Sequence, residues 1–199
     1  MHPKLPQFAA GNRMAMMLGG YLLFCLLYLG APLLAMRAPA TVPALWPDDM
    51  IPFMPMALWP YLSQFALLFC AIWFAPDNAQ RTRTFYAMLL ASAVASVIFI
   101  VFPTELPRQT VEGAGWKLLY TLDVPGNCFP SLHAALAALS AAALMRAGRG
   151  WAVAVPLWVA VIIFSTLATK QHMVIDIVGG LALALASHMT VRRWQAGAS

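Results

Sequence analysis

The feature that most constrains the fold of this sequence is a series of long apolar runs separated by short polar connections. A helix needs about 20 mostly apolar residues to cross a bilayer. Six runs qualify, at residues 15–36, 56–75, 84–103, 131–147, 151–169 and 172–190. Backbone groups in lipid must be paired within the spanning segment, so we expect helices and no strands. We therefore predict an all-α, polytopic membrane protein in which residues 1–199 form a single domain with six transmembrane helices.

The composition supports this prediction. Only 10% of the residues are charged, whereas a soluble domain of this length would carry about 25%. The first run, Ala15 to Met36, is longer than the roughly 7–15 apolar residues at the core of a signal peptide, so we interpret it as an uncleaved span. The fourth run is the shortest and the richest in alanine.

The net charge of +5 is distributed unevenly between the two sides of the membrane. With six spans, both termini lie on one side, together with eight of the twelve cationic residues: Lys4, Arg13, Arg81, Arg83, Arg146, Arg149, Arg192 and Arg193. Cationic residues in short loops accumulate on the cytoplasmic side. We predict cytoplasmic termini in a bacterial inner membrane, and we interpret the basic charge as a topology signal that implies no nucleic acid partner.

Two polar segments interrupt the apolar pattern and carry the candidate chemistry. The first, Asn-Cys-Phe-Pro-Ser-Leu-His at 127–133, precedes the fourth run, and the second, 165–176, joins the fifth run to the sixth. His172 and Asp176 are four residues apart, so they share one face of a helix. An imidazole held by a carboxylate occurs in many arrangements of a nucleophile or a base. Taken alone, the pair could equally be a polar cap on a membrane helix.

The two segments together resemble two signatures of the type 2 phosphatidic acid phosphatase superfamily, Pro-Ser-Gly-His and Ser-Arg-x5-His-x3-Asp. They read Pro130-Ser131-Leu132-His133 and Ser165-Thr166-x5-His172-x3-Asp176 here. Leu132 and the run Thr169-Lys170-Gln171-His172 are similar to the branch that includes inositol phosphorylceramide synthases. A further signature of the superfamily, Lys-x6-Arg-Pro, is matched only by Arg108, because Val101 and Gln109 stand at its other two positions.

The resemblance implies a role for each of three residues. His172 would be the nucleophile and form a phosphohistidine, Asp176 would orient its ring, and His133 would act as general acid and base. This chemistry needs no metal and no other cofactor. The acidic residues expected on the exterior side show no ligand spacing that would indicate a metal site, and Asp48 and Asp49 are interpreted as solvated loop carboxylates.

The spacing of the segments predicts where this site lies. One span, a turn at residues 148–150 and a second span separate His133 from His172, so both should lie on the exterior face. Small residues in the fourth and sixth runs, including Gly179 and Gly180, allow close approach of membrane helices. We therefore expect these two helices to pack together, and their N-termini to favour a phosphate.

Polar residues around the two segments are the candidate phosphate ligands. They are Arg108, Asn127, Ser131, Ser165, Thr166, Lys170 and Gln171. Thr166 stands where the superfamily has an arginine, so we expect Lys170 to supply part of the missing charge. A short surface helix at residues 116–122 should form the floor of the site.

We interpret the chain as a membrane enzyme that hydrolyses a phosphate monoester or pyrophosphate of a lipid at the exterior face. Its partners would be a phosphorylated lipid and the bilayer. An alternative is transfer of a phospho-headgroup to a lipid alcohol, as inositol phosphorylceramide synthases do, which uses the same intermediate. A non-catalytic lipid transporter or scaffold is a further alternative, favoured by Thr166 and by the incomplete signature around Arg108.

Overall fold

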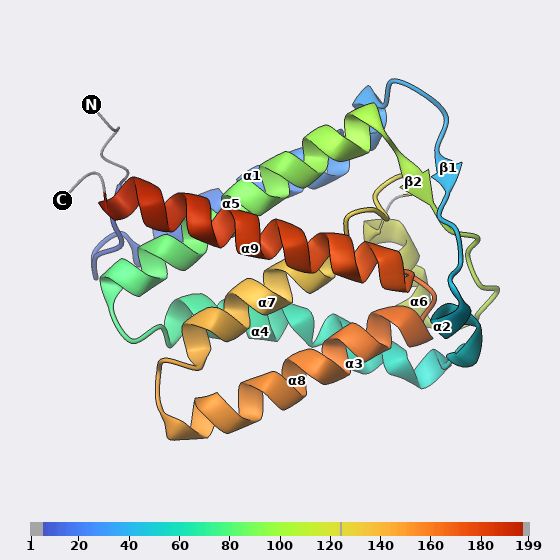
Figure 1. Ribbon diagram of the computed structural model, residues 1–199. Helices are drawn as coiled ribbons and strands as arrows, with labels where there is room; N and C mark the ends of the chain where they lie inside the picture. Colours follow the sequence, from blue (N-terminus) through green and yellow to red (C-terminus); the bar gives the residue numbers. More distant parts are fainter. Residues whose placement is uncertain (1–5, 124, 197–199) are drawn as a thin grey trace.

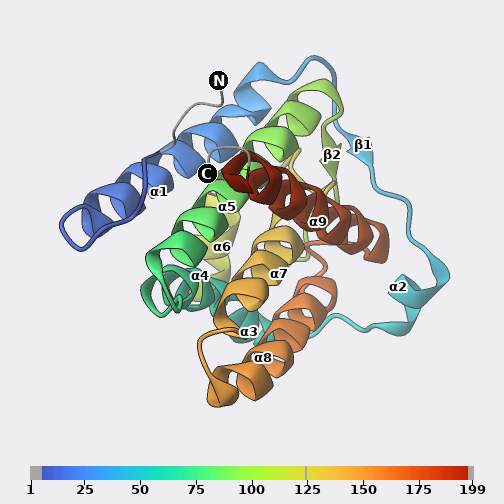
Figure 2. The ribbon, with the colours of Figure 1, turned by 60° about the vertical axis from the view of Figure 1, so that its left-hand side comes forward.

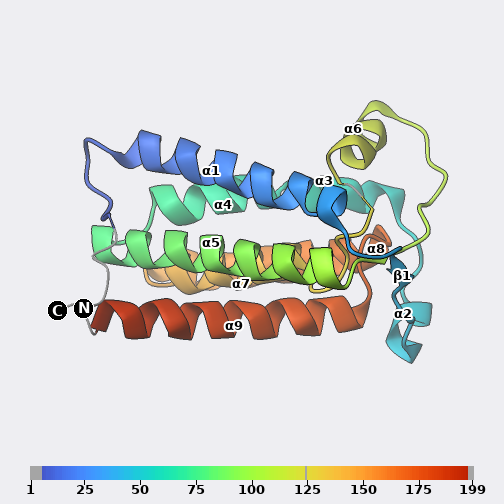
Figure 3. The ribbon, with the colours of Figure 1, turned by 90° about the horizontal axis from the view of Figure 1, so that it is seen from above.

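Apolar helices lying side by side form the body of the protein (Figures 1 and 3). The structure is a computed structural model that describes residues 6–123 and 125–196. The longer helices are α1 (Arg13–Gly30), α4 (Gln64–Trp73), α5 (Asn78–Val101), α7 (Leu132–Leu144), α8 (Arg149–Ala168) and α9 (Val174–Ala196). The shorter elements are η1 (Pro32–Leu34), β1 (Ala40–Thr41), α2 (Trp46–Met50), η2 (Pro55–Ala57), α3 (Leu58–Leu62), β2 (Thr104–Glu105) and α6 (Ala114–Leu122).

In the described residues, 5 segments are long and apolar enough to cross a membrane. They are Arg13–Leu34, Pro55–Trp73, Asn78–Val101, Arg149–Ala168 and Val174–Ala196. Helix α7 is also apolar, but its 13 residues cover about 20 Å at 1.5 Å per residue, less than the roughly 30 Å of a hydrocarbon core. The prediction of a helical membrane protein is confirmed, whereas a sixth full-length span remains a prediction.

The short helix α7 occupies the centre of the bundle (Figures 1 and 2). It packs against α4, α5, α8 and α9, and its alanines at 134, 135, 137 and 143 are fully buried. Protein surrounds α7, so its ends need not reach the membrane surfaces directly. This explains why α7 occupies only part of the predicted run 131–147.

The prediction that the fourth and sixth apolar runs pack together is confirmed by α7 and α9. A Cβ atom added to Gly180 of α9 would lie 2.2 Å from the carbonyl oxygen of Ser131, at the start of α7. Only a residue without a side chain allows this approach. The main chains also bond directly, because the Ser131 N–H donates to the carbonyl oxygen of Asp176 at 2.9 Å.

The helix of the second apolar run is interrupted at Ser63. Helix α3 contains Pro60 and ends at Leu62, and α4 begins at Gln64. The Ser63 side chain occupies the break, where its hydroxyl donates to the Pro60 carbonyl and accepts a bond from Trp158 Nε1 of α8. The Ser63 hydroxyl and the Pro60 carbonyl are thus both hydrogen-bonded inside the bundle.

The expectation of a structure without strands is wrong at one end of the bundle. Strands β1 and β2 form a two-stranded parallel sheet, in which Ala40 pairs with Thr104. Thr104 also bonds the loop before α7, because its hydroxyl accepts from the Phe129 N–H and its carbonyl from the Cys128 N–H. These strands lie outside the candidate spans.

The two ends of the bundle carry different elements (Figures 1 and 3). Elements α2, α6, β1 and β2 lie at one end, together with the starts of α7 and α9. The start of α1, the end of α9 and the connection between α7 and α8 lie at the other end. The predicted surface helix at 116–122 is confirmed as α6, at the same end as both polar segments.

We expect Gly180→Ala to destabilise the protein by about 1–3 kcal/mol, because overpacking of a filled interface costs energy of this size. Gly19→Ala is the matched control, since nothing lies within 4 Å of a Cβ atom at that helical position. Both substitutions gain the same helix propensity, so their difference isolates the contact with Ser131. Thermal unfolding in detergent measures it, and equal melting temperatures would contradict the prediction.

Candidate active site

The two histidines of the polar segments meet at one end of the bundle. His133 lies in the first turn of α7, and His172 lies in the connection between α8 and α9. Their ring centroids are 5.8 Å apart, with 53° between the ring planes. A phosphate could therefore contact both rings at once.

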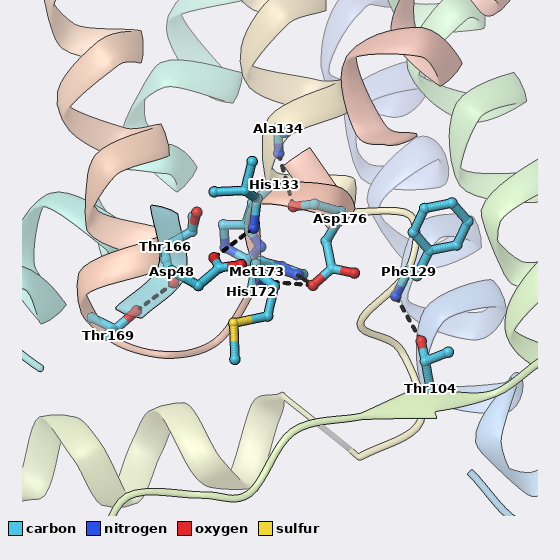
Figure 4. A network of polar contacts seen from close by, with 12 residues as sticks. Asp48, Thr104, Phe129, His133, Ala134, Thr166, Thr169, His172, Met173 and Asp176 are labelled. Atoms are coloured by element: carbon cyan, nitrogen blue, oxygen red, sulfur yellow. Dashed lines mark hydrogen bonds and ion pairs between the residues drawn. The ribbon is translucent and has the colours of Figure 1, made fainter. Parts of the chain in front are cut away.

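A carboxylate lies behind the ring of His172 (Figure 4). Asp176 Oδ2 is 3.7 Å from His172 Nδ1, and it accepts a hydrogen bond of 2.8 Å from the Met173 N–H. Asp176 is fully buried. Within the described residues, His172 Nδ1 and Asp176 Oδ1 have no hydrogen-bond partner. Catalytic hydrogen bonds are often long before substrate binds, so this arrangement suits a carboxylate that orients the ring.

The ring of His133 is fixed by Tyr61 of α3. The two rings stack with centroids 4.2 Å apart, and the Tyr61 hydroxyl lies 3.4 Å from His133 Nδ1. This contact leaves Nε2 as the ring nitrogen available to a substrate. Sequence reasoning missed Tyr61, because a tyrosine within an apolar run carries no signal for a partner 72 positions away.

Ser131 joins the two signatures through the main chain. It caps α7, since its hydroxyl oxygen accepts from the Ala134 N–H at 3.2 Å, and it has no exposed surface. Asn127 donates to the Tyr28 carbonyl at 3.0 Å, and its Oδ1 is buried without a partner in the described part of the chain. Asn127 therefore retains an acceptor that could bind a proton-bearing group.

The residues of the second signature shape the loop that carries His172. Ser165 and Thr166 are buried in the last turns of α8, where their hydroxyls donate to main-chain carbonyls. The Thr166 carbonyl accepts from the N–H groups of Gln171 and His172, at 3.1 and 3.2 Å. These contacts hold the main chain of the loop, and direct contact of Ser165, Thr166 and Gln171 with phosphate remains a prediction.

Two spaces of different character reach the histidines. A small polar pocket of about 30 Å³ borders His172. Its walls include the candidate ligands Arg108, Asn127, Lys170 and Gln171. A much larger apolar cavity, of about 560 Å³, lies among α1, α3, α4, α5 and α7 and reaches His133. Asp123, at the end of α6, lines both spaces.

A family model of the PAP2 superfamily matches residues 54–190, which include both polar segments and every helix from α3 to α8. The chain belongs to the PAP2 superfamily. No curated protein and no solved structure matches it. Membership indicates phosphatase or phosphotransferase activity on phosphate esters, and the apolar helices place this PAP2 protein in a membrane.

The two candidate cations of this PAP2 protein are held by main-chain carbonyls. Lys170 Nζ donates to the carbonyl oxygens of Asp48 and Ile51, at 2.9 and 2.6 Å. Arg108 donates to the carbonyl of Tyr120, at 2.8 Å, and to that of Asp123. Both residues border the polar pocket, so their charge acts there, and direct contact with phosphate remains a prediction.

Asp48 differs from its interpretation as a solvated loop carboxylate. Its side chain is only 3% exposed, and its Oδ1 accepts from the N–H of Val174, the first residue of α9, at 2.8 Å. Asp49 is exposed, as expected. The sequence could not reveal the contact of Asp48, because its partner lies 126 positions away.

Cys128 adjoins the site but is not suited to nucleophilic chemistry. Burial raises the pKa of its thiol well above the ordinary value, and the nearby carboxylates of Asp176 and Asp123 raise this pKa further. A thiol must be deprotonated to attack. Cys128 therefore remains a neutral thiol at physiological pH, and His172 is the better candidate nucleophile.

We expect Lys170→Ala to lower turnover about ten- to hundredfold, because a charge-assisted hydrogen bond carries a free energy that corresponds to this change in rate. Lys117→Ala, on the exposed face of α6, should change turnover less than twofold or so. Rates of phosphate release in detergent compare the two variants. Equal, small effects would show that Lys170 contributes neither charge nor loop geometry to catalysis.

Proposed function

We propose that this PAP2 protein is a membrane lipid phosphatase that hydrolyses a phosphate monoester or pyrophosphate through a phosphohistidine at His172. The observation that carries the proposal is the pairing of His133, which lines the apolar cavity, with His172, which lines the polar pocket. The cations Arg108 and Lys170 at the polar pocket favour a phosphate, and the apolar cavity suits the chain of a lipid. A cavity of about 560 Å³ lies in the size range of ordinary ligand sites.

The geometry supports a two-step reaction. His172 Nδ1 faces Asp176, so Nε2 attacks phosphorus and forms the P–N bond. The bond to the leaving oxygen breaks as protonated His133 donates its proton to that oxygen. His133 then takes a proton from a water molecule, which attacks phosphorus, and the P–N bond breaks to release phosphate. General acid–base catalysis of this kind contributes about 10²–10⁴-fold to the rate.

The positions of the two rings indicate on which side of the bound phosphate the nucleophile lies and on which side the leaving group lies. An in-line attack by His172 places the leaving oxygen on the opposite side, towards His133. His133 lines the apolar cavity, whereas His172 lines the polar pocket. The leaving group therefore departs into apolar surroundings, which fits a lipid alcohol.

The same geometry supports the second candidate function, transfer of a phospho-headgroup to a lipid alcohol. By microscopic reversibility, an acceptor replaces the leaving group on the side of His133. The apolar cavity on that side can admit a second lipid alcohol after the first departs. Hydrolysis and transfer then differ only in whether water or this alcohol reaches the phosphohistidine first.

We expect His172→Ala to abolish turnover while the protein remains folded and inserted. Phosphate release from a short-chain lipid phosphate in detergent is the assay, with and without an added lipid alcohol as competing acceptor. His188→Ala, on α9 beyond the site, is the matched control and should retain activity. Full activity of His172→Ala would exclude it as the nucleophile, and a phosphorylated alcohol as the main product would favour transfer.

The orientation of the site is a further part of the proposal, and it decides which leaflet supplies the substrate. We expect Thr110→Cys, on a Cys-free background, to react with an impermeant maleimide on intact cells, and Gly148→Cys to remain unlabelled. Both positions are exposed, and they lie near opposite ends of the bundle, before α6 and at the start of α8. This pattern would place the site outside the cytoplasm with cytoplasmic termini, and the reverse pattern would place it inside.

A further inference from the structure

The loop that carries His172 is held from outside the bundle by residues 48–54, a segment that we call the clamp. The clamp contains most of α2 and precedes α3. It bonds the loop through its main chain and through one side chain. The bonds run from Met54 N–H to the Ala168 carbonyl (2.8 Å), from Lys170 Nζ to the carbonyls of Asp48 (2.9 Å) and Ile51 (2.6 Å), and from the Val174 N–H to Asp48 Oδ1 (2.8 Å).

Asp48 is the side chain through which the clamp reaches α9. Its two carboxylate oxygens are both used, since Oδ1 accepts from Val174 and Oδ2 accepts from the Leu45 N–H at 2.8 Å. The first N–H groups of a helix lack partners within the helix, and the positive end of the helix dipole favours a carboxylate. A buried carboxylate is stable only when it is bonded in this way. Asp48 therefore fixes the main chain two residues after His172.

Lys170 shows that the loop needs this support. Its φ of 54° lies in the left-handed region, which is costly for a residue with a side chain. Such a conformation persists only where the surroundings impose it. Here the two carbonyls of the clamp hold the ammonium group, and the Thr166 carbonyl holds the N–H groups that follow.

We propose that Asp48 is a positioning residue for His172. Through Val174 it sets the main chain from which the imidazole extends, and so the direction of Nε2 towards phosphorus. Figure 4 shows Asp48 beside Met173 and His172, on the side away from Asp176. Asp48 lies outside the matched residues 54–190, so the assignment does not follow from family membership. It rests on the proposed function of His172.

The test compares Asp48→Asn with Asp49→Asn. Asp48→Asn keeps the size of the side chain but removes the negative charge and one of its two acceptor oxygens. Asp49→Asn removes the same charge from the exposed neighbouring residue. A misplacement of about 1 Å can cost about 100-fold in rate. We expect Asp48→Asn to lower kcat about ten- to hundredfold with KM within about twofold, and Asp49→Asn to match the wild type.

Inhibition separates positioning from simple loss of structure. Vanadate mimics the transition state by bonding to the nucleophile, whereas inorganic phosphate occupies the pocket without a bond to it. Vanadate inhibition should weaken in Asp48→Asn in parallel with kcat, while inhibition by phosphate stays unchanged. A parallel loss of both inhibitors, together with a lower melting temperature, would mean that Asp48 is merely structural and would overturn the proposal.

A second variant breaks the same bond from its other end. Val174→Pro removes the donor N–H, and proline is tolerated at the first position of a helix. It should reproduce the effect of Asp48→Asn, and the double variant should be no worse than either single one, because both remove one interaction. Additive losses would contradict a shared hydrogen bond.

Ring signals of His172 provide a readout that does not depend on turnover. ¹⁵N-histidine NMR in detergent, with His172→Ala to assign the signals, should show a shifted His172 ring in Asp48→Asn but not in Asp49→Asn. If the wild type has no turnover, the proposed function fails, and these signals still decide whether Asp48 positions the ring. An unchanged ring and an unchanged kcat in Asp48→Asn would overturn the inference alone.

Discussion

The close contact between α7 and α9 is the constraint on which the rest of the site depends. Gly180 brings the two helices so near that a single methyl group would overlap the Ser131 carbonyl, and the Ser131 N–H bonds the Asp176 carbonyl. The main chains of the two polar segments are thereby fixed to each other. This contact between α7 and α9 determines the distance between His133 and His172. It therefore determines the space available for phosphorus between the two rings.

Because they are buried in an apolar bundle, several polar residues of the second signature bond the main chain and so stabilise the loop around His172. A hydroxyl or an ammonium group away from water must be bonded, because an unpaired buried polar group costs about 1–3 kcal/mol. Ser165, Thr166 and Lys170 meet this need through main-chain carbonyls, and so they shape the loop around His172. The buried atoms without partners in the described residues include His172 Nδ1, Asp176 Oδ1 and Asn127 Oδ1, all at the site.

The arrangement of polar and apolar space relates the fold to the proposed function. Helix α1 packs mainly against α5, and the apolar cavity lies between this helix and the centre of the bundle. At the site end, the Tyr28 hydroxyl of α1 donates to Asp123, which lines both the cavity and the polar pocket. A lipid phosphate placed with its chain in the cavity would therefore present its phosphorus between the two histidines.

The sequence alone determined three features, because each depends on local sequence. The helical membrane fold follows from the length of the apolar runs, and the surface helix α6 follows from its aromatic and cationic residues. The pairing of His172 with Asp176 follows from their separation by four positions. Only the tertiary structure decided that α7 is short and central, that Tyr61 stacks on His133 and that Asp48 bonds the start of α9. The contacts of Tyr61 and Asp48 join positions 72 and 126 residues apart, and contacts at such separations leave no period or spacing in a single sequence. The small parallel sheet was not predicted for the same reason. Its two strands pair through main-chain groups of residues 40–41 and 104–105, and the side chains of these residues carry no signal for that pairing.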